Sequence, residues 1–100
     1  MAVETAIDTV QGLIAGGPWF HLDTDRDVLY LRHPEYRSVS TFGEETPEGF
    51  TRLETEDGRF AGITVVDYWR EYGVGPLDTA SIRSIRESIA DWALKHFPSN

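Results

Sequence analysis

Apolar and polar residues alternate along two segments of the chain, and a short polar stretch interrupts each of them. Residues 19–33 read WFHLDTDRDVLYLRH, and residues 49–69 read GFTRLETEDGRFAGITVVDYW. Alternation with a period of two is typical of half-buried strands, and a turn-forming break between two such runs is typical of a hairpin. The two segments therefore predict two neighbouring hairpins in one small antiparallel sheet.

The register of the first hairpin follows from its loop. A four-residue loop at 24–27 sets Leu22 opposite Leu29 and Phe20 opposite Leu31. Residues directly opposite one another share a face of the sheet, and a slip of one residue would turn them all to the other face. We therefore expect these four residues to form one buried apolar layer. The second, mixed face carries Trp19, His21, Val28, Tyr30 and Arg32.

The second hairpin is predicted to pair residues 50–55 with residues 60–67 around Asp57-Gly58, because glycine tolerates the positive φ that tight turns require. The run ITVVDYW at 63–69 is almost continuously apolar, which indicates a central strand that is buried on both faces.

Proline limits the connection between the two hairpins. Pro34 ends the first hairpin, since proline cannot donate to a strand ladder. Residues 36–42 predict a further strand, and residues 43–49, GEETPEG, predict a surface loop.

Helical spacing marks both ends of the chain. Apolar residues recur at three and four over 2–15 and predict a helix that Gly16-Gly17-Pro18 ends. A second helix is predicted over 79–97, with Asp78, Thr79 or Ser81 as its N-cap. Its apolar seam consists of Ile82, Ile85, Ile89, Trp92 and His96. The fold expected from these patterns is α+β: an antiparallel β-meander of four to five strands over 19–69, on which an N-terminal and a C-terminal helix pack.

Composition agrees with one folded domain of 100 residues, since 40% of them are hydrophobic and 12% aromatic. The net charge is −8, and residues 44–57 hold six acidic residues against Arg52 alone. An acidic surface repels phosphate, which argues against direct nucleic-acid binding. The acidic stretch is either a solvated face or a docking face for a basic partner.

The chain has no cysteine, which excludes thiolate chemistry, and no apolar run long enough to span a bilayer. Its first residues, MAVETAIDTVQGLIAGG, carry acidic residues in place of a basic leader. These features predict a cytoplasmic protein without a membrane partner.

Two stretches, FHLDTDRDVLYLRH and LETEDGRFAGITVVD, together resemble a small bacterial family called domain of unknown function 2283. The resemblance covers the central half of the chain, and it implies a compact β-meander and no established activity. The matching positions are Asp23, Asp27, Leu29, Tyr30, Asp57, Gly58, Arg59, Gly62, Ile63 and Asp67.

No stretch carries a strong catalytic, metal or nucleotide signature. Asp23, Asp25 and Asp27 are spaced like the start of a calcium loop, but Val28 and Pro34 stand where that loop needs glycine and glutamate. We therefore interpret the three aspartates as hairpin-turn residues and expect neither a metal nor a cofactor.

Two surfaces are candidates for binding. His21, Tyr30 and Asp67 are the candidate ligand-binding group, with Trp69 beside them, because a histidine, a phenol and a carboxylate that converge can support acid–base chemistry. The aromatic residues of the chain otherwise indicate a packed core or an aromatic-lined contact surface. The candidate partner-binding residues are Glu44, Glu45, Glu48 and Trp92.

The function that these features favour is a non-catalytic interaction module, antitoxin-like or inhibitor-like, that binds a basic protein or forms a homodimer through its C-terminal seam. The alternative is a small-molecule-binding protein or minor enzyme that uses His21, Tyr30 and Asp67. A third hypothesis is an acidic mimic of nucleic acid that acts through Glu44, Glu45 and Glu48.

Overall fold

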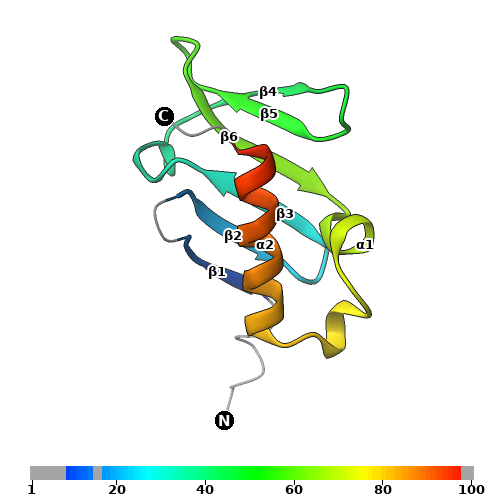
Figure 1. The fold of residues 1–100 in the computed structure, drawn as a ribbon. Helices are drawn as coiled ribbons and strands as arrows, with labels where there is room; N and C mark the ends of the chain where they lie inside the picture. The colour runs from blue at the N-terminus through cyan, green and yellow to red at the C-terminus, as the bar shows by residue number, and fades with distance from the viewer. Residues whose placement is uncertain (1–8, 15–16, 98–100) are drawn as a thin grey trace.

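A computed structural model describes residues 9–14 and 17–97 of the chain. They form an antiparallel sheet of six strands in the order β1-β2-β3-β6-β5-β4, with a long helix across one face (Figure 1). The α+β class is therefore confirmed. The strands are β1 (Thr9–Leu13), β2 (Trp19–Asp23), β3 (Val28–Arg32), β4 (Phe42–Glu45), β5 (Thr51–Glu54) and β6 (Phe60–Val66), and the helices are α1 (Tyr68–Tyr72) and α2 (Ile82–His96).

The first hairpin has the predicted register. Leu22 pairs with Leu29 and Phe20 with Leu31, and all four side chains are at most 1% exposed. Alternation of apolar and polar residues is a local signal, and here the tertiary structure agrees with it.

Helix α2 covers this apolar layer. Ile85, Ile89 and Trp92 are buried against the sheet, and burying one such side chain stabilises the fold by about 1.5–3 kcal/mol. Ser81 is the N-cap, since its hydroxyl accepts a hydrogen bond from the Ser84 N–H at 3.0 Å. The ends of the predicted seam differ from its centre, because Ile82 is 46% exposed and His96 is exposed.

The predicted N-terminal helix over 2–15 is wrong in its described part. Thr9–Leu13 is the edge strand β1, antiparallel to β2, with Val10 opposite Leu22. Val10 is 4% exposed in the core below α2. Pairing with an open strand edge outweighs a weak helical spacing, and Gly12 in mid-segment lowers the helix propensity further. Residues 2–8 and 15 lie outside the described residues.

The connection between the hairpins also differs from the prediction. Pro34–Tyr36 is a 3₁₀ turn, and the strand lies at Phe42–Glu45, where a loop was expected. The sheet therefore has six strands and not four or five, and the prediction of a strand over 36–42 is wrong. Residues 42–45 become a strand because they pair with β5, with Glu45 opposite Thr51.

The second hairpin is confirmed, and β6 lies in the middle of the sheet between β3 and β5. Strand and helix meet close together here: β6 ends at Val66, which is 61% exposed, and α1 begins at Tyr68. The strand predicted through residue 69 therefore stops three residues early. Gly62 permits the close approach of β3, because a Cβ atom at this position would lie 2.1 Å from the Leu31 carbonyl oxygen.

Candidate functional site

The carboxylate of Asp27 holds α1 in place from the turn between β2 and β3. Its two oxygens accept hydrogen bonds from the backbone N–H groups of Trp69 at 2.8 Å and Arg70 at 3.0 Å. The Asp27 carbonyl oxygen also accepts from the Tyr68 N–H at 3.1 Å. Asp27 thus caps a helix more than forty residues away, a role that the sequence spacing did not indicate.

His21 and Tyr30, two of the predicted ligand-binding residues, lie side by side on the sheet face that α2 does not cover. Their ring centroids are 5.7 Å apart, and Trp19 contacts the other side of His21 at 5.9 Å. Both His21 and Tyr30 are half-buried. The expected contact between β2 and β3 on this face is therefore present.

Asp67 and Trp69 lie at the start of α1, and neither takes part in the contact between His21 and Tyr30. Asp67 is the exposed residue before α1 and has a left-handed φ of 58°. Trp69 is 6% exposed in the core below α2, and its indole N–H donates to the Gly75 carbonyl at 2.8 Å. In the part of the chain that the structure describes, no hydrogen bond or ion pair links the Asp67 side chain to His21 or Tyr30.

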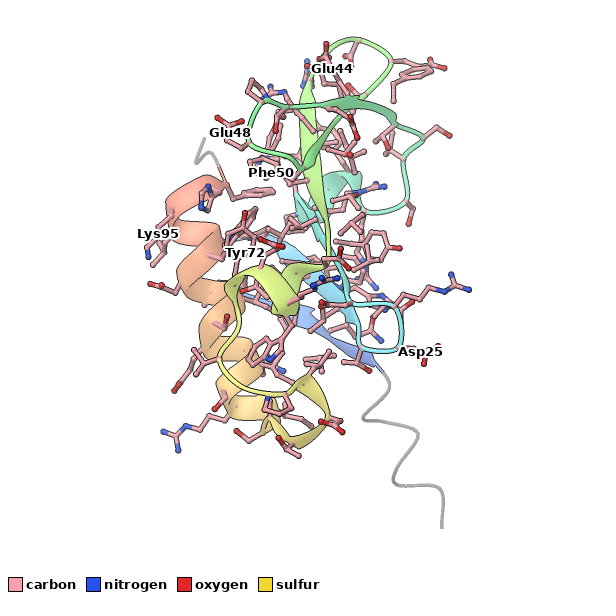
Figure 2. The ribbon with its side chains drawn as sticks, turned by 90° about the vertical axis from the view of Figure 1, so that its right-hand side faces the viewer. Asp25, Glu44, Glu48, Phe50, Tyr72 and Lys95 are labelled. Carbon is pink, nitrogen blue, oxygen red and sulfur yellow. The ribbon has the colours of Figure 1, made fainter. Side chains whose placement is uncertain are left out.

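The predicted partner-binding carboxylates lie at the β4 edge. Glu44 and Glu45 belong to β4, all of whose residues are exposed, and Glu48 lies in the turn to β5. Figure 2 shows Glu44 and Glu48 at the end of the molecule opposite Asp25, with Glu48 near Phe50 and Lys95. Glu48, Phe50 and Lys95 line a hollow of about 320 Å³ between β5 and the C-terminal end of α2.

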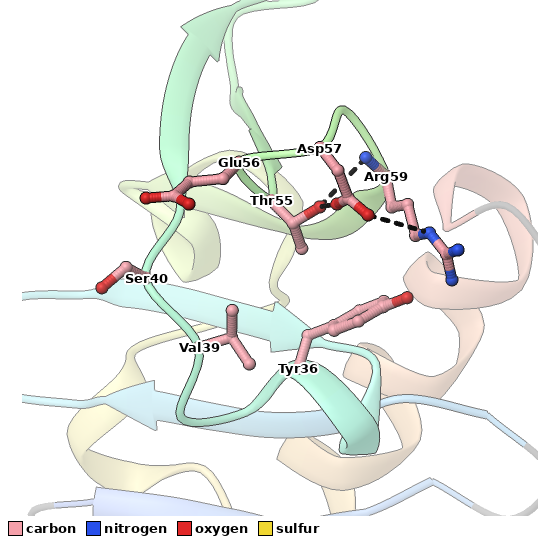
Figure 3. Close-up of a pocket in the computed structure, with 7 residues that line it drawn as sticks. All are labelled: Tyr36, Val39, Ser40, Thr55, Glu56, Asp57 and Arg59. Carbon is pink, nitrogen blue, oxygen red and sulfur yellow. Dashed lines mark hydrogen bonds and ion pairs between the residues drawn. The ribbon is translucent and has the colours of Figure 1, made fainter.

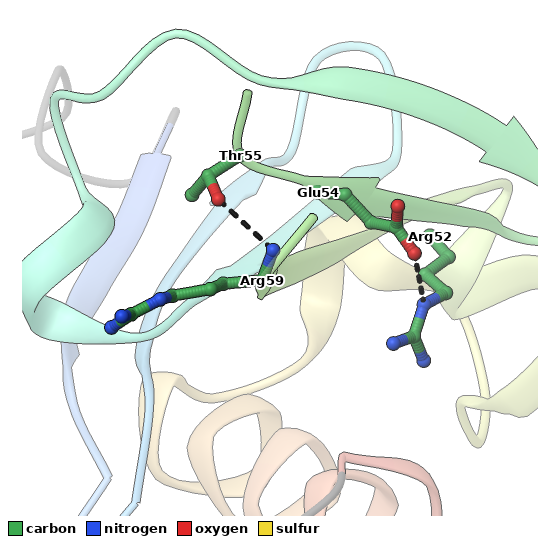
Figure 4. A network of polar contacts seen from close by, with 4 residues as sticks. All are labelled: Arg52, Glu54, Thr55 and Arg59. Atoms are coloured by element: carbon green, nitrogen blue, oxygen red, sulfur yellow. Dashed lines mark hydrogen bonds and ion pairs between the residues drawn. The ribbon is translucent and has the colours of Figure 1, made fainter. Parts of the chain in front are cut away.

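The basic residues near this edge already have partners. Arg52 lies directly opposite Glu44 but pairs with Glu54 at 3.3 Å (Figure 4), and its guanidinium lies over the Phe60 ring at 4.6 Å. No ion pair to Glu44, Glu45 or Glu48 exists among residues 9–14 and 17–97. The three carboxylates are therefore left without an ion pair in the described part of the chain.

A second hollow, of about 440 Å³, lies beside the β5–β6 turn (Figure 3). The Thr55 hydroxyl donates to the Asp57 carboxylate and accepts from the Arg59 N–H at 3.1 Å. The hydrogen bond from Thr55 lowers the pKa of Asp57, and a hydrogen bond with the Tyr36 hydroxyl raises the pKa of Arg59. The Thr55 oxygen thus has both a donor and an acceptor within the turn, and its two hydrogen bonds hold the turn together.

Trp92, the fourth predicted partner-binding residue, is only 4% exposed and lies in an aromatic cluster. His96 stacks on it at 4.3 Å, and Phe50, Tyr72 and Tyr68 contact it edge-on at 5.4, 5.6 and 6.0 Å. The spacing of Trp92 and His96 on one helix face was visible in the sequence. Phe50 directly precedes β5, and Tyr68 and Tyr72 belong to α1, so only the tertiary structure brings these three rings to Trp92.

Metal and membrane features are absent from the described ranges. No group of three histidine or acidic side chains within 9–14 and 17–97 is arranged to hold a metal ion. Neither α1 nor α2 is long and apolar enough to cross a bilayer.

The chain was compared with protein-family models, with curated proteins and with solved structures, and none of them matches it. The resemblance to domain of unknown function 2283 accordingly stays a prediction. The site has to be interpreted from its own geometry.

Proposed function

We propose that this protein is a non-catalytic interaction module that binds a basic segment of a partner protein along the edge strand β4. The observation that carries the proposal is that every residue of β4, an edge strand of the sheet, is exposed. An edge strand presents unpaired backbone N–H and C=O groups, and an extended peptide can add to them as a further strand.

The charges of β4 favour a basic partner. Glu44 and Glu45 are successive residues of a strand, so their side chains point to opposite faces, and Glu48 follows in the turn. A basic strand laid along β4 would meet a carboxylate on each face. Phe42, which is 63% exposed, adds apolar surface for the stem of a lysine or arginine side chain.

A second copy of the chain is a poor occupant for this edge. Two chains of net charge −8 repel one another. The C-terminal seam expected to serve a homodimer is also occupied, because Ile85, Ile89 and Trp92 are buried against the chain's own sheet. We therefore assign the edge to a different, basic protein.

Variants that remove negative charges test the proposal, and the measurement is whether each variant still captures the partner protein. E44Q/E45Q/E48Q keeps the shape of the edge and removes three negative charges. The matched control D25N/E71Q/D78N removes three charges from exposed residues outside β4. We expect the first variant to lose the captured partner and the control to retain it. Equal loss in both would show that only net charge matters, and retention in both would contradict the proposal.

A defined peptide separates strand addition from plain charge attraction. The probe is an octapeptide of alternating lysine and valine, and its control carries N-methyl groups on alternate backbone nitrogens. Both have the same charge, but the control cannot form a ladder on one side. We expect the first peptide to shift the backbone amide signals of residues 42–45 in NMR spectra. Equal binding of the methylated control would contradict strand addition.

The alternative of a small-molecule site is favoured by the contact between His21 and Tyr30. Its third member, Asp67, makes no hydrogen bond or ion pair with them among the described residues. Replacing Asp67 by asparagine tests this alternative, since a ligand held by all three groups would bind more weakly to the variant.

A further inference from the structure

A cavity of about 580 Å³ lies between α1 and α2, apart from the β4 edge. Its size is within the range of pockets that bind small molecules, about 300–1,000 Å³. Aromatic rings from α1 and α2 and polar groups from α2 both contribute to the walls. The lining includes Tyr68, Tyr72, Val74, Ser88, Asp91 and Trp92.

Trp92, which lines the cavity, carries a hydrogen-bond donor without an acceptor. Trp92 is 4% exposed, and its indole Nε1–H is the one buried side-chain polar group without a hydrogen-bond partner in the described part of the chain. By contrast, the Trp69 indole donates to the Gly75 carbonyl at 2.8 Å. Buried donors are nearly always paired, because an unpaired one costs the free energy of its lost hydration. An acceptor supplied by a ligand would remove that cost.

The rim of the cavity leaves apolar surface in water. Tyr72 is 41% exposed and Val74 is 89% exposed. Tyr72 is the last residue of α1, and its ring contacts Trp92 at 5.6 Å. A ring inserted beside Tyr72 would cover this surface. The indole nitrogen itself is buried, so the neighbouring side chains have to shift before a ligand can reach it.

The charged residues around the cavity are paired with one another and favour a neutral ligand. Asp91 pairs with Lys95 at 3.3 Å, and Glu87 pairs with Arg83 at 3.5 Å. Among the lining residues that the structure describes, no lysine or arginine is left unpaired to attract an anion, and no carboxylate is left unpaired to attract a cation. The hydroxyl groups of Tyr68 and Ser88, 2.8 Å apart, offer further polar contacts.

We propose that the cavity between α1 and α2 binds a small, neutral, planar ring compound with a carbonyl or ring-nitrogen acceptor, which accepts the hydrogen bond of Trp92 Nε1–H. The aromatic side chains in the walls stack on the ring. A donor group on the ligand, such as an amide NH₂, reaches the Tyr68 and Ser88 oxygens.

Three probes with the same ring and different charges test this assignment: nicotinamide, which is neutral, nicotinate, which is an anion, and 1-methylnicotinamide, which is a cation. Compounds of this size bind at roughly millimolar concentration. We expect nicotinamide to bind best and to move the Trp92 indole signal in ¹H–¹⁵N NMR spectra downfield, while the Trp19 and Trp69 indole signals stay in place. Tighter binding of either charged probe would overturn the ligand class.

The variant Trp92→Phe removes the N–H and keeps an aromatic ring, and Trp19→Phe, on the uncovered sheet face, is the matched control. We expect nicotinamide to bind about fivefold to tenfold more weakly to the first variant, as for the loss of one hydrogen bond, and unchanged to the second. The titration of the unaltered protein needs no variant, so a folding defect in Trp92→Phe leaves the proposal testable.

An unmoved Trp92 indole signal at millimolar nicotinamide would overturn the proposal. It would show that neighbouring rings already satisfy the N–H group. The E44Q/E45Q/E48Q variant should bind nicotinamide with the same affinity as the unaltered protein. The proposal for this cavity and the proposal for the β4 edge can therefore be contradicted independently.

Discussion

Aspartate side chains form hydrogen bonds in both the turn between β2 and β3 and the turn between β5 and β6, but they bind different parts of the chain. In the first, the Asp23 carboxylate accepts from the N–H groups of Asp25 and Arg26 at 3.1 and 3.2 Å, and Asp27 reaches out to cap α1. In the second, Asp57 bonds only within its own turn, to Thr55 and Arg59. One turn joins distant parts of the chain, and the other closes a hairpin.

The comparison shows that residue type alone does not give the role of a turn aspartate. Asp27 has a left-handed φ of 58°, which turns its carboxylate toward the start of α1. The N-cap position of α1 is held by Asp67, whose own side chain makes no capping bond. Helix α1 has only five residues, so it is too short to be stable alone and depends on the cap from Asp27.

The largest expected effect is that of Asp27→Ala. It removes two hydrogen bonds to helix N–H groups and places alanine at a positive φ, so we expect a loss of about 3 kcal/mol in the free energy of unfolding. Urea denaturation measures this loss. Asp25→Ala in the same turn is the control, with an expected change below about 0.5 kcal/mol. Similar losses in the two variants would show that Asp27 has only a local role.

A smaller effect is expected for Thr55→Val in the second turn. Thr55 is 6% exposed, and its hydroxyl bridges the Asp57 carboxylate and the Arg59 N–H. Valine keeps the shape and loses both bonds, so we expect a loss of about 1–2 kcal/mol by urea denaturation. Thr55→Ser, which keeps the hydroxyl group, should recover most of it. A loss larger than that of Asp27→Ala would reverse the proposed difference between the turns.

The smallest effect, and one that depends on pH, is that of Asp57→Asn. The hydrogen bond from Thr55 lowers the pKa of Asp57 in the folded protein. A lowered pKa stabilises the fold above the pKa of free aspartate, about 4, and this contribution is lost as the pH falls through the lower folded value. The difference in stability between the unaltered protein and Asp57→Asn should therefore be present at neutral pH and disappear in acid.

A double variant attributes that difference to its cause. In the Thr55→Val background the pKa of Asp57 should return toward its ordinary value, and Asp57→Asn should then show a weaker dependence on pH. An unchanged dependence in this background would assign the lowered pKa to the other two causes, the backbone hydrogen bond of Asp57 and the charge of Arg59, which lies 3.3 Å from Asp57.

The sequence predicted contacts among the candidate binding residues only where those contacts are local. His21 and Tyr30 meet because hairpin register places them opposite one another. Asp67 and Trp69 follow β6 in the chain, but the left-handed backbone at Asp67 starts α1, and Trp69 turns into the core. The surroundings of Trp92 come from three parts of the chain, so spacing along one helix could not identify its neighbours.

The sequence by itself determined the two hairpins, their inward apolar layer and helix α2, because alternation, turn residues and capping act between residues close in the chain. The tertiary structure decided that Thr9–Leu13 forms a strand, where β4 lies and where α1 begins. Each of these segments has weak local preferences. β1 and β4 become strands because they extend the sheet by pairing with β2 and β5, and α1 takes its cap from Asp27, more than forty residues away.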